Sequence, residues 1–78
     1  MTTNFLSAIA QRPVIADGAM GTQLFAAGVD PASCADHATL ASPGLVRRVH
    51  KSYLAAGAEV IETNTFGANS VKLARFGL

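Results

Sequence analysis

The side chains best suited to chemistry lie in one short polar turn, which follows the apolar residues 14–16. This turn contains Asp17, Gly18, Gly21 and Thr22. Its two glycines allow the backbone to turn tightly and let a ligand approach the main-chain N–H groups. Ligands bind where the C-terminal ends of parallel strands meet, so Asp17 is a candidate site residue. A second interpretation stays open, because Asp is also a common helix N-cap.

Composition narrows the class of protein. Of the 78 residues, 50% are hydrophobic and 14% are charged, which excludes a disordered chain. The net charge of +1 gives no basis for a nucleic acid or an anionic membrane as partner. The single cysteine rules out an internal disulfide framework, and no apolar run approaches the roughly 18 residues of a membrane span. The N-terminus also lacks a basic segment ahead of its apolar stretch, so we expect a soluble, cytoplasmic protein.

Four helices are predicted from capping residues and apolar spacing. A leading helix has Thr2, Thr3 or Asn4 as its cap and ends before Pro13, and a short second helix over residues 23–27 is closed by Gly28. The longest helix begins at Ser42 and Pro43, ends at Gly57 and places Leu45, Val49 and Tyr53 on one face, and the last follows Asn69 or Ser70 and ends at Gly77. Residues 29–42 are predicted to form a long loop, which in a compact chain is often functional.

Two strands are predicted, over residues 14–16 and 59–63, the second because it is rich in β-branched residues. Strands joined through a helix are normally parallel neighbours about 4.8 Å apart. This arrangement would bring Asp17 close to Asn64 and Thr65 in one small pocket. The predicted class is therefore α/β with about two βα units. Two strands alone leave both sheet edges unpaired, so we expect an N-terminal fragment of a larger structure such as a (β/α)8 barrel.

Several motifs in order along the chain resemble the start of the homocysteine S-methyltransferase domain. They are Asp17-Gly18-Ala19-Met20-Gly21-Thr22, Pro43 with Leu45-Val46 and His50, Ala56-Gly57-Ala58, and residues 61–69, Ile-Glu-Thr-Asn-Thr-Phe-Gly-Ala-Asn. Each motif is weak by itself, but their order and spacing make a specific match from about Pro13 to Leu78. The resemblance implies a (β/α)8 TIM barrel, of which residues 1–78 would be a partial homocysteine-binding domain, truncated before the strands that carry the zinc ligands.

The resemblance also implies the chemistry. In this family a zinc ion held by three cysteine thiolates binds homocysteine as its thiolate, which attacks the methyl group of a donor to make methionine. The expected partners are homocysteine and a methyl donor, and a cobalamin or folate donor fits the family. Cys34 alone cannot build a three-cysteine site, so no metal ligand and no catalytic residue is assigned to this chain. We expect the isolated chain to be inactive.

The substrate-binding residues are carried over by their positions in the motifs. Asp17 would hold the amino group of homocysteine, while Gly18, Gly21 and Thr22 would shape the turn. Asn64 and Thr65 would offer polar contacts nearby. Glu62 is assigned to the site with an alternative open, because an acid on a strand either marks a site or reaches solvent or a cation.

Other residues have structural interpretations. Cys34 is expected to be a loop or packing residue, His50 a packing or capping residue, and Met20 and Tyr53 core residues. The loop of residues 34–40 departs from the family's usual acidic-Leu-Asn pattern, so it is assigned no substrate contact. A function of another class also stays open, namely a non-enzymatic βαβα module that self-associates or docks on a partner to cover its open edges. As a barrel fragment, the chain would need the remainder of the barrel for the same purpose. A third possibility is another small-molecule enzyme on the same fold.

Overall fold

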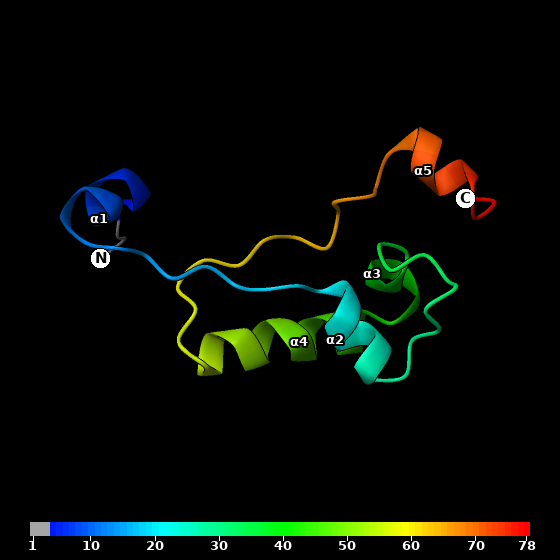
Figure 1. Ribbon diagram of the computed structural model, residues 1–78, viewed down its shortest axis with the longest axis horizontal. Coiled ribbons are helices and arrows are strands. Elements are labelled where there is room, and N and C mark those ends of the chain that lie inside the picture. The colour runs from blue at the N-terminus through cyan, green and yellow to red at the C-terminus, as the bar shows by residue number, and fades with distance from the viewer. Residues whose placement is uncertain (1–3) are drawn as a thin grey trace.

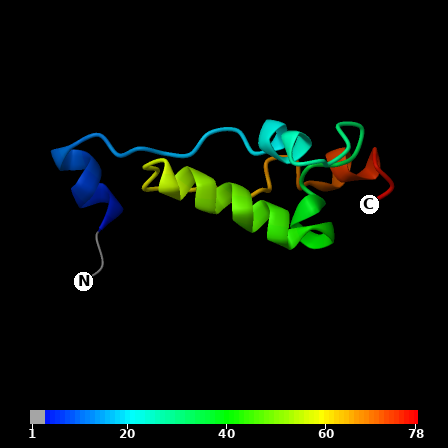
Figure 2. The ribbon, with the colours of Figure 1, turned by 90° about the horizontal axis from the view of Figure 1, so that it is seen from below.

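A computed structural model describes residues 4–78, and this part of the chain contains five helices. They are α1 (Phe5–Gln11), α2 (Gly21–Ala26), α3 (Ala38–Ala41), α4 (Pro43–Ala55) and α5 (Ser70–Ala74). The molecule is elongated, 44 × 25 × 19 Å, with α1 at one end and α5 at the other (Figure 1). Two extended segments run between these ends, and α4 lies alongside the segment that leads to α2 (Figures 1 and 2).

The predicted α/β class is wrong, since residues 4–78 contain no sheet. A single parallel bridge joins Ala16 to Val60 where two strands were expected. Its backbone bonds run from Asp17 N–H to the Val60 carbonyl at 3.0 Å and from Val60 N–H to the Ile15 carbonyl at 3.2 Å, and the Glu59 N–H donates to the same Ile15 carbonyl at 2.7 Å. No further strand lies on either outer edge within these residues, and an isolated pair of strands is only marginally stable, which accounts for the single bridge. The description as two βα units of a TIM barrel is therefore corrected to a helical chain with two extended segments.

The core lies between α2, α3 and α4. Its buried side chains are Leu24, Ala38, Val46 and Val49, and Leu24 is completely buried. Burying one such leucine side chain is worth about 1.5–3 kcal/mol. The predicted apolar face of the long helix is confirmed, because Leu45 and Tyr53 pack against this cluster beside Val49. Met20 and Tyr53 join the core as expected.

Helix ends follow local chemistry closely. The side chain of Asn4 accepts N–H bonds from Leu6 and Ser7, and that of Asn69 accepts one from Lys72, so both asparagines are N-caps. Thr2 and Thr3, the other cap candidates, lie outside the described residues. Pro43 is at the start of α4, where it needs no N–H partner. Gly57 ends that helix with a φ of +113°, a conformation that favours glycine.

The segment predicted as a loop, residues 29–42, contains one unexpected helix. The helix α3 is a single turn of four residues, and His37 at its N-cap makes no side-chain capping bond. So short a helix has little intrinsic stability. It is held by packing, because Ala38 is buried against the core. The sequence offered no capping or periodic signal for it.

One ion pair ties the N-terminal part of the chain to the second extended segment. Both guanidinium nitrogens of Arg12 donate to the Glu59 carboxylate, at 2.8 and 2.7 Å. These hydrogen bonds lower the pKa of Glu59 below its usual range. Both side chains are solvent-exposed, so the pair adds little to the stability of the fold. None of the helices in residues 4–78 has the combination of length and apolar character needed to cross a membrane.

Candidate functional site

A polar hollow of about 400 Å³ lies where the Asp17 turn meets the chain after the second extended segment. Its charged lining is three carboxylates and one ammonium group, from Asp17, Asp36, Glu62 and Lys72. The rest of the lining comes from Gly18, Ala19, Met20, Gly21, Ala35, Thr63, Asn64, Thr65, Phe66 and Gly67. We call this space the Asp17 hollow. Its excess of negative charge favours a ligand that carries a cationic group.

Asp17 joins the two extended segments and does not cap a helix. Its backbone N–H donates to the Val60 carbonyl, and its Oδ2 accepts the N–H of Glu62 at 3.0 Å. The N-cap position of α2 belongs to Met20, which makes no side-chain capping bond. The helix-cap interpretation of Asp17 is therefore wrong. One carboxylate oxygen of Asp17 is fixed by the protein, while the residue as a whole is half-buried on the wall of the hollow.

The space left by the missing side chain of Gly18 is filled by another residue of the protein. The sequence had suggested that this space serves a ligand. The Tyr53 hydroxyl donates to the Ala19 carbonyl at 2.6 Å. A Cβ on Gly18 would lie only 2.9 Å from that hydroxyl oxygen and 3.1 Å from Cε1 of the same ring. The missing side chain thus lets Tyr53 on α4 reach the turn and hold its backbone in place. Sequence analysis placed Tyr53 in the core but missed this contact with the turn.

The other two predicted turn residues behave differently. Gly21 is the first residue of α2 and lines the hollow, and a Cβ there would meet only Phe25, at 3.8 Å. Thr22 is exposed on α2 and is not among the residues that line the hollow. The structure therefore brings Asp17, Gly18 and Gly21 together with the second turn, but leaves Thr22 outside it.

Asn64 connects the second turn to the loop before α3. It is 9% exposed, and its Nδ2 donates to the Ala35 carbonyl at 2.8 Å and to the Thr39 hydroxyl at 3.1 Å. Both amide hydrogens of Asn64 are therefore used within the protein. A ligand could accept one of them only if a bond to Ala35 or Thr39 were broken. Thr65 is exposed on the hollow, and its hydroxyl lies 2.6 Å from that of Thr63.

Glu62 lines the hollow and is solvent-exposed. Glu62 was assigned to the site because burying an unpaired acid is costly. Since its side chain is exposed, that cost does not apply. Its carboxylate makes no ion pair among residues 4–78, where the Arg12–Glu59 pair is the one salt bridge found. Glu62 adds to the negative charge of the hollow and leaves its carboxylate open to a ligand.

Asp36 is a site residue that sequence analysis missed. Its Oδ1 accepts the N–H of Gly67 at 3.0 Å, and its Oδ2 lies 3.8 Å from the Cys34 sulfur, which donates to it. These bonds bring the loop before α3 against the turn after the second extended segment. The sequence signal that could have identified Asp36 is an acid in a long irregular loop. Its contact with Gly67 could not be predicted, because that contact depends on the tertiary structure.

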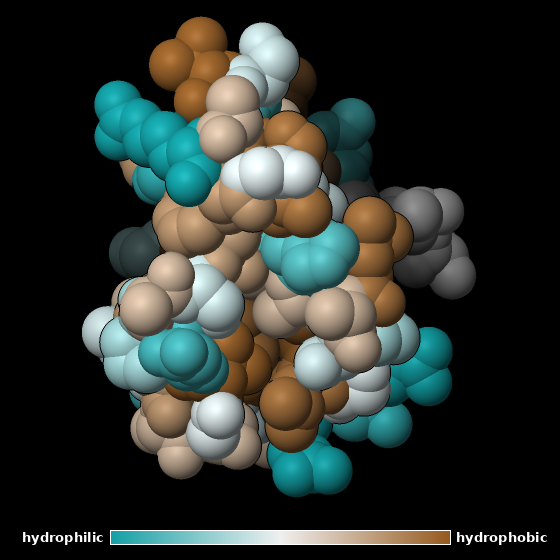
Figure 3. Space-filling view, turned by 90° about the vertical axis from the view of Figure 1, so that its right-hand side faces the viewer, coloured by the Kyte–Doolittle hydropathy of each residue, from teal (hydrophilic) through white to brown (hydrophobic). Residues whose placement is uncertain are grey.

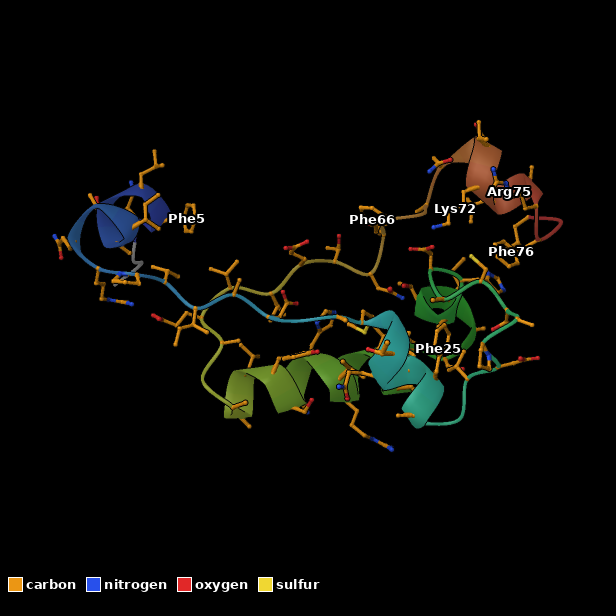
Figure 4. All side chains as sticks on the ribbon, viewed as in Figure 1. Phe5, Phe25, Phe66, Lys72, Arg75 and Phe76 are labelled. Atoms are coloured by element: carbon orange, nitrogen blue, oxygen red, sulfur yellow. The ribbon has the colours of Figure 1, made fainter. Side chains whose placement is uncertain are left out.

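Lys72 and Phe66 form the edge of the hollow nearest α5. The Lys72 ammonium nitrogen lies 5.7 Å from the centroid of the Phe66 ring, within the range of a cation–π contact (Figure 4). Phe66 is 97% exposed, so this contact covers little of the ring. Neither residue was singled out from the sequence as part of a site.

The donor set does not fit a zinc site. No group of three or more His, Cys, Asp or Glu side chains among residues 4–78 is arranged to hold a metal ion. Cys34 is buried as a free thiol, in the packing position expected for it. His50 lies on α4, away from the hollow, with its buried Nδ1 unpaired. The resemblance to a zinc-dependent domain therefore finds no metal ligands in the part of the chain that the structure describes.

A second hollow, of about 460 Å³, lies between residues 27–45 and the end of the chain. Its lining includes Cys34, His37, Leu45, Phe76 and Leu78 and contains no Asp or Glu side chain. It therefore offers little to a charged metabolite. The Asp17 hollow is the better candidate site, since it combines fixed polar groups with charge.

Comparisons with known proteins agree with the motifs. The family profile described as Homocysteine S-methyltransferase matches residues 14–78. Among curated proteins, the chain is 36% identical over 84 residues to methionine synthase of Mycobacterium tuberculosis (strain ATCC 25618 / H37Rv) and equally identical to methionine synthase of Mycobacterium leprae (strain TN). Each match covers 97% of this chain but 7% of the relative. No solved structure matches significantly.

Proposed function

This chain belongs to the homocysteine S-methyltransferase family, and we propose that its Asp17 hollow binds homocysteine for methyl transfer. In the reaction the substrate sulfur loses its proton and forms a bond to the methyl carbon of a donor, while the bond between that carbon and the donor breaks and leaves its electron pair on the donor; the product is methionine. In this proposal the chain is part of a homocysteine-binding domain. Its partners are homocysteine and a methyl donor.

The observation that carries this proposal is the setting of Asp17. The Glu62 N–H fixes one oxygen of its carboxylate, and the hollow around it holds two further carboxylates, from Asp36 and Glu62. A primary ammonium group carries three donors and a positive charge, so it matches this surface. The amino group of homocysteine would then donate to Asp17. Its sulfur would project away from the carboxylates, where an uncharged or anionic group is tolerated.

Methyl transfer itself is not assigned to residues of this chain. The family resemblance implies zinc, but Cys34 is a lone buried thiol and no cluster in residues 4–78 fits the metal. We therefore propose that the 78 residues bind homocysteine without transferring a methyl group, and that the metal ligands belong to other residues of a longer domain. Formation of methionine by the purified chain, supplied with zinc and a methyl donor, would overturn this part of the proposal.

The binding proposal is tested by titrating the chain with L-homocysteine under reducing conditions and following backbone amide signals by NMR. Asp17→Asn keeps an oxygen for the Glu62 N–H but removes the charge, so we expect affinity to fall about five- to twentyfold. Asp30→Asn is the matched control. Asp30 is exposed, accepts the Ala32 N–H and lies outside the hollow, so its loss of charge leaves binding unchanged. Equal affinities for wild type and Asp17→Asn would refute the assignment.

Exposed apolar side chains favour the alternative of a non-enzymatic module that self-associates. Leu40 is 80% exposed, Val71 72% and Phe66 97%. Figure 3 shows hydrophobic surface among hydrophilic groups on the face of the molecule nearest α3 and α5. A second copy of the chain would bury such surface. Light scattering that finds a defined dimer, together with no homocysteine binding, would support this function over the first.

A further inference from the structure

We propose that Lys72 binds the α-carboxylate of the amino acid held in the Asp17 hollow, so that Asp17 and Lys72 together select a zwitterion. This inference rests on the proposed function and extends it by naming a second recognition group. It begins from the charges of the lining, which are three carboxylates and one cation, Lys72.

A homocysteine α-carboxylate entering this hollow meets repulsion from Asp17, Asp36 and Glu62. It needs a compensating cation or several N–H donors. Two backbone donors of the lining are already used within the protein, because the Glu62 N–H bonds to Asp17 and the Gly67 N–H bonds to Asp36. The N–H groups of Gly18 and Ala19 make no hydrogen bond among residues 4–78, but they carry no net charge to offset the three carboxylates. Lys72 is the cationic side chain in the lining and has no ion pair among residues 4–78. Its charge is therefore available to a ligand.

The structure holds the Lys72 side chain at the edge of the hollow. A Cβ on Gly67 would lie 2.8 Å from Cδ and 3.1 Å from Cε of Lys72, so the lysine stem passes directly over this glycine. Its ammonium nitrogen lies 5.7 Å from the centroid of the Phe66 ring, and Figure 4 shows the two labelled side chains near each other. Gly67 is itself fixed by Asp36. The ammonium is thus partly positioned before a ligand binds, which reduces the entropy cost of the contact.

Other positive side chains do not compete for this role. Arg75 follows α5 and is absent from the lining, and Arg12 is engaged by Glu59. Lys51 lies on α4 beside a different, apolar hollow. A ligand carboxylate in the Asp17 hollow would therefore find Lys72 as its cationic partner.

The experiment compares two ligands and two lysine variants of the 78-residue chain by NMR titration. The ligands are L-homocysteine and 3-aminopropane-1-thiol, which keeps the amine and the thiol but lacks the carboxylate. Lys72→Met should weaken L-homocysteine binding about three- to fivefold and should not weaken binding of the amine, which loses a like-charge neighbour. Lys51→Met, the same change outside the hollow, should alter neither affinity. Circular dichroism spectra matching wild type show that the variants keep their helices.

The outcomes separate the proposal that the hollow binds homocysteine from the proposal that Lys72 binds its carboxylate. If Asp17→Asn weakens L-homocysteine binding but Lys72→Met does not, the inference about Lys72 is wrong and the proposed function stands. If Lys72→Met weakens both ligands equally, the lysine acts on the shape of the hollow, and the carboxylate contact is refuted. If wild type binds neither ligand, the proposed function fails and this inference fails with it. Lys72→Arg gives a further check, since restoring the charge should restore most of the preference for L-homocysteine.

Discussion

The role of Gly18 can be tested through its coupling to Tyr53. In the wild-type chain the Tyr53 hydroxyl donates to the Ala19 carbonyl at 2.6 Å. Gly18→Ala would place a Cβ 2.9 Å from that oxygen, closer than real Cβ atoms approach, so the ring must move and the bond is lost. The net contribution of such a hydrogen bond to the free energy of unfolding is about 1 kcal/mol. Gly18 does not have a positive φ, so the alanine is not strained by its own backbone.

Two effects of opposite sign set the expected magnitude. Replacing a glycine by alanine at a compatible backbone position stabilises a protein by about 0.4–1 kcal/mol, by restricting the unfolded chain. In the wild-type background the lost bond and the displaced ring exceed this gain, so Gly18→Ala should destabilise the fold slightly, by up to about 1 kcal/mol. In a Tyr53→Phe background the oxygen is gone and the nearest ring atoms lie at 3.1 and 3.3 Å. There the same change should be near neutral.

Urea unfolding followed by circular dichroism measures the free energy of unfolding of wild type, both single variants and the double variant. We expect a coupling of about 1 kcal/mol between positions 18 and 53. Gly44→Ala is the matched control, because Gly44 lies within α4 with no atom near its missing Cβ. It should stabilise the helix by about 0.5–1 kcal/mol in either background. An equal cost of Gly18→Ala with and without the Tyr53 hydroxyl would refute this reasoning.

Three further predictions concern the core, the second turn and the N-terminal ion pair. Leu24→Ala removes the completely buried side chain and should cost about 2–5 kcal/mol, enough in so small a core to abolish cooperative unfolding by circular dichroism. Asn64→Ala breaks two bonds to residues 35–39 and should cost about 1–3 kcal/mol and increase hydrogen exchange there. Bonding to Arg12 lowers the folded-state pKa of Glu59, so its stabilisation is present above the ordinary glutamate pKa of about 4.3 and is lost as the pH falls through the lower folded value. Unfolding curves of wild type and Glu59→Gln should therefore differ at neutral pH and converge in acid, and a constant difference would contradict the assignment.

Much of the helical structure was predictable because its determinants are local. An asparagine side chain that accepts an N–H two or three residues ahead marks the start of α1 or α5 wherever the helix packs. The beginning of α4 at Pro43 and its end at Gly57 follow equally from backbone geometry. The family assignment was also predictable, since motifs in order along the chain carry it, and the match over residues 14–78 confirms it.

The strands were predicted wrongly because a strand depends on neighbours that lie elsewhere. Residues 14–16 and 59–63 have suitable side chains, and Ala16 does pair with Val60. A stable sheet also needs further strands on its outer edges, and residues 4–78 do not supply them. The helix α3 was missed for a related reason, because packing of Ala38 stabilises it and its own sequence carries little helical signal.

By itself, then, the sequence determined the caps that begin α1 and α5, both ends of α4, the family and the candidacy of Asp17, all of which depend on residues close together in the chain or on motifs in order. Only the tertiary structure decided what Asp17 contacts, since the N–H that it accepts belongs to Glu62, 45 residues away. It also decided that Asp36 and Lys72 join the hollow, and that Gly18 makes room for Tyr53. These contacts join segments far apart in the chain. Their distances depend on how the helices pack, which local residue chemistry does not specify.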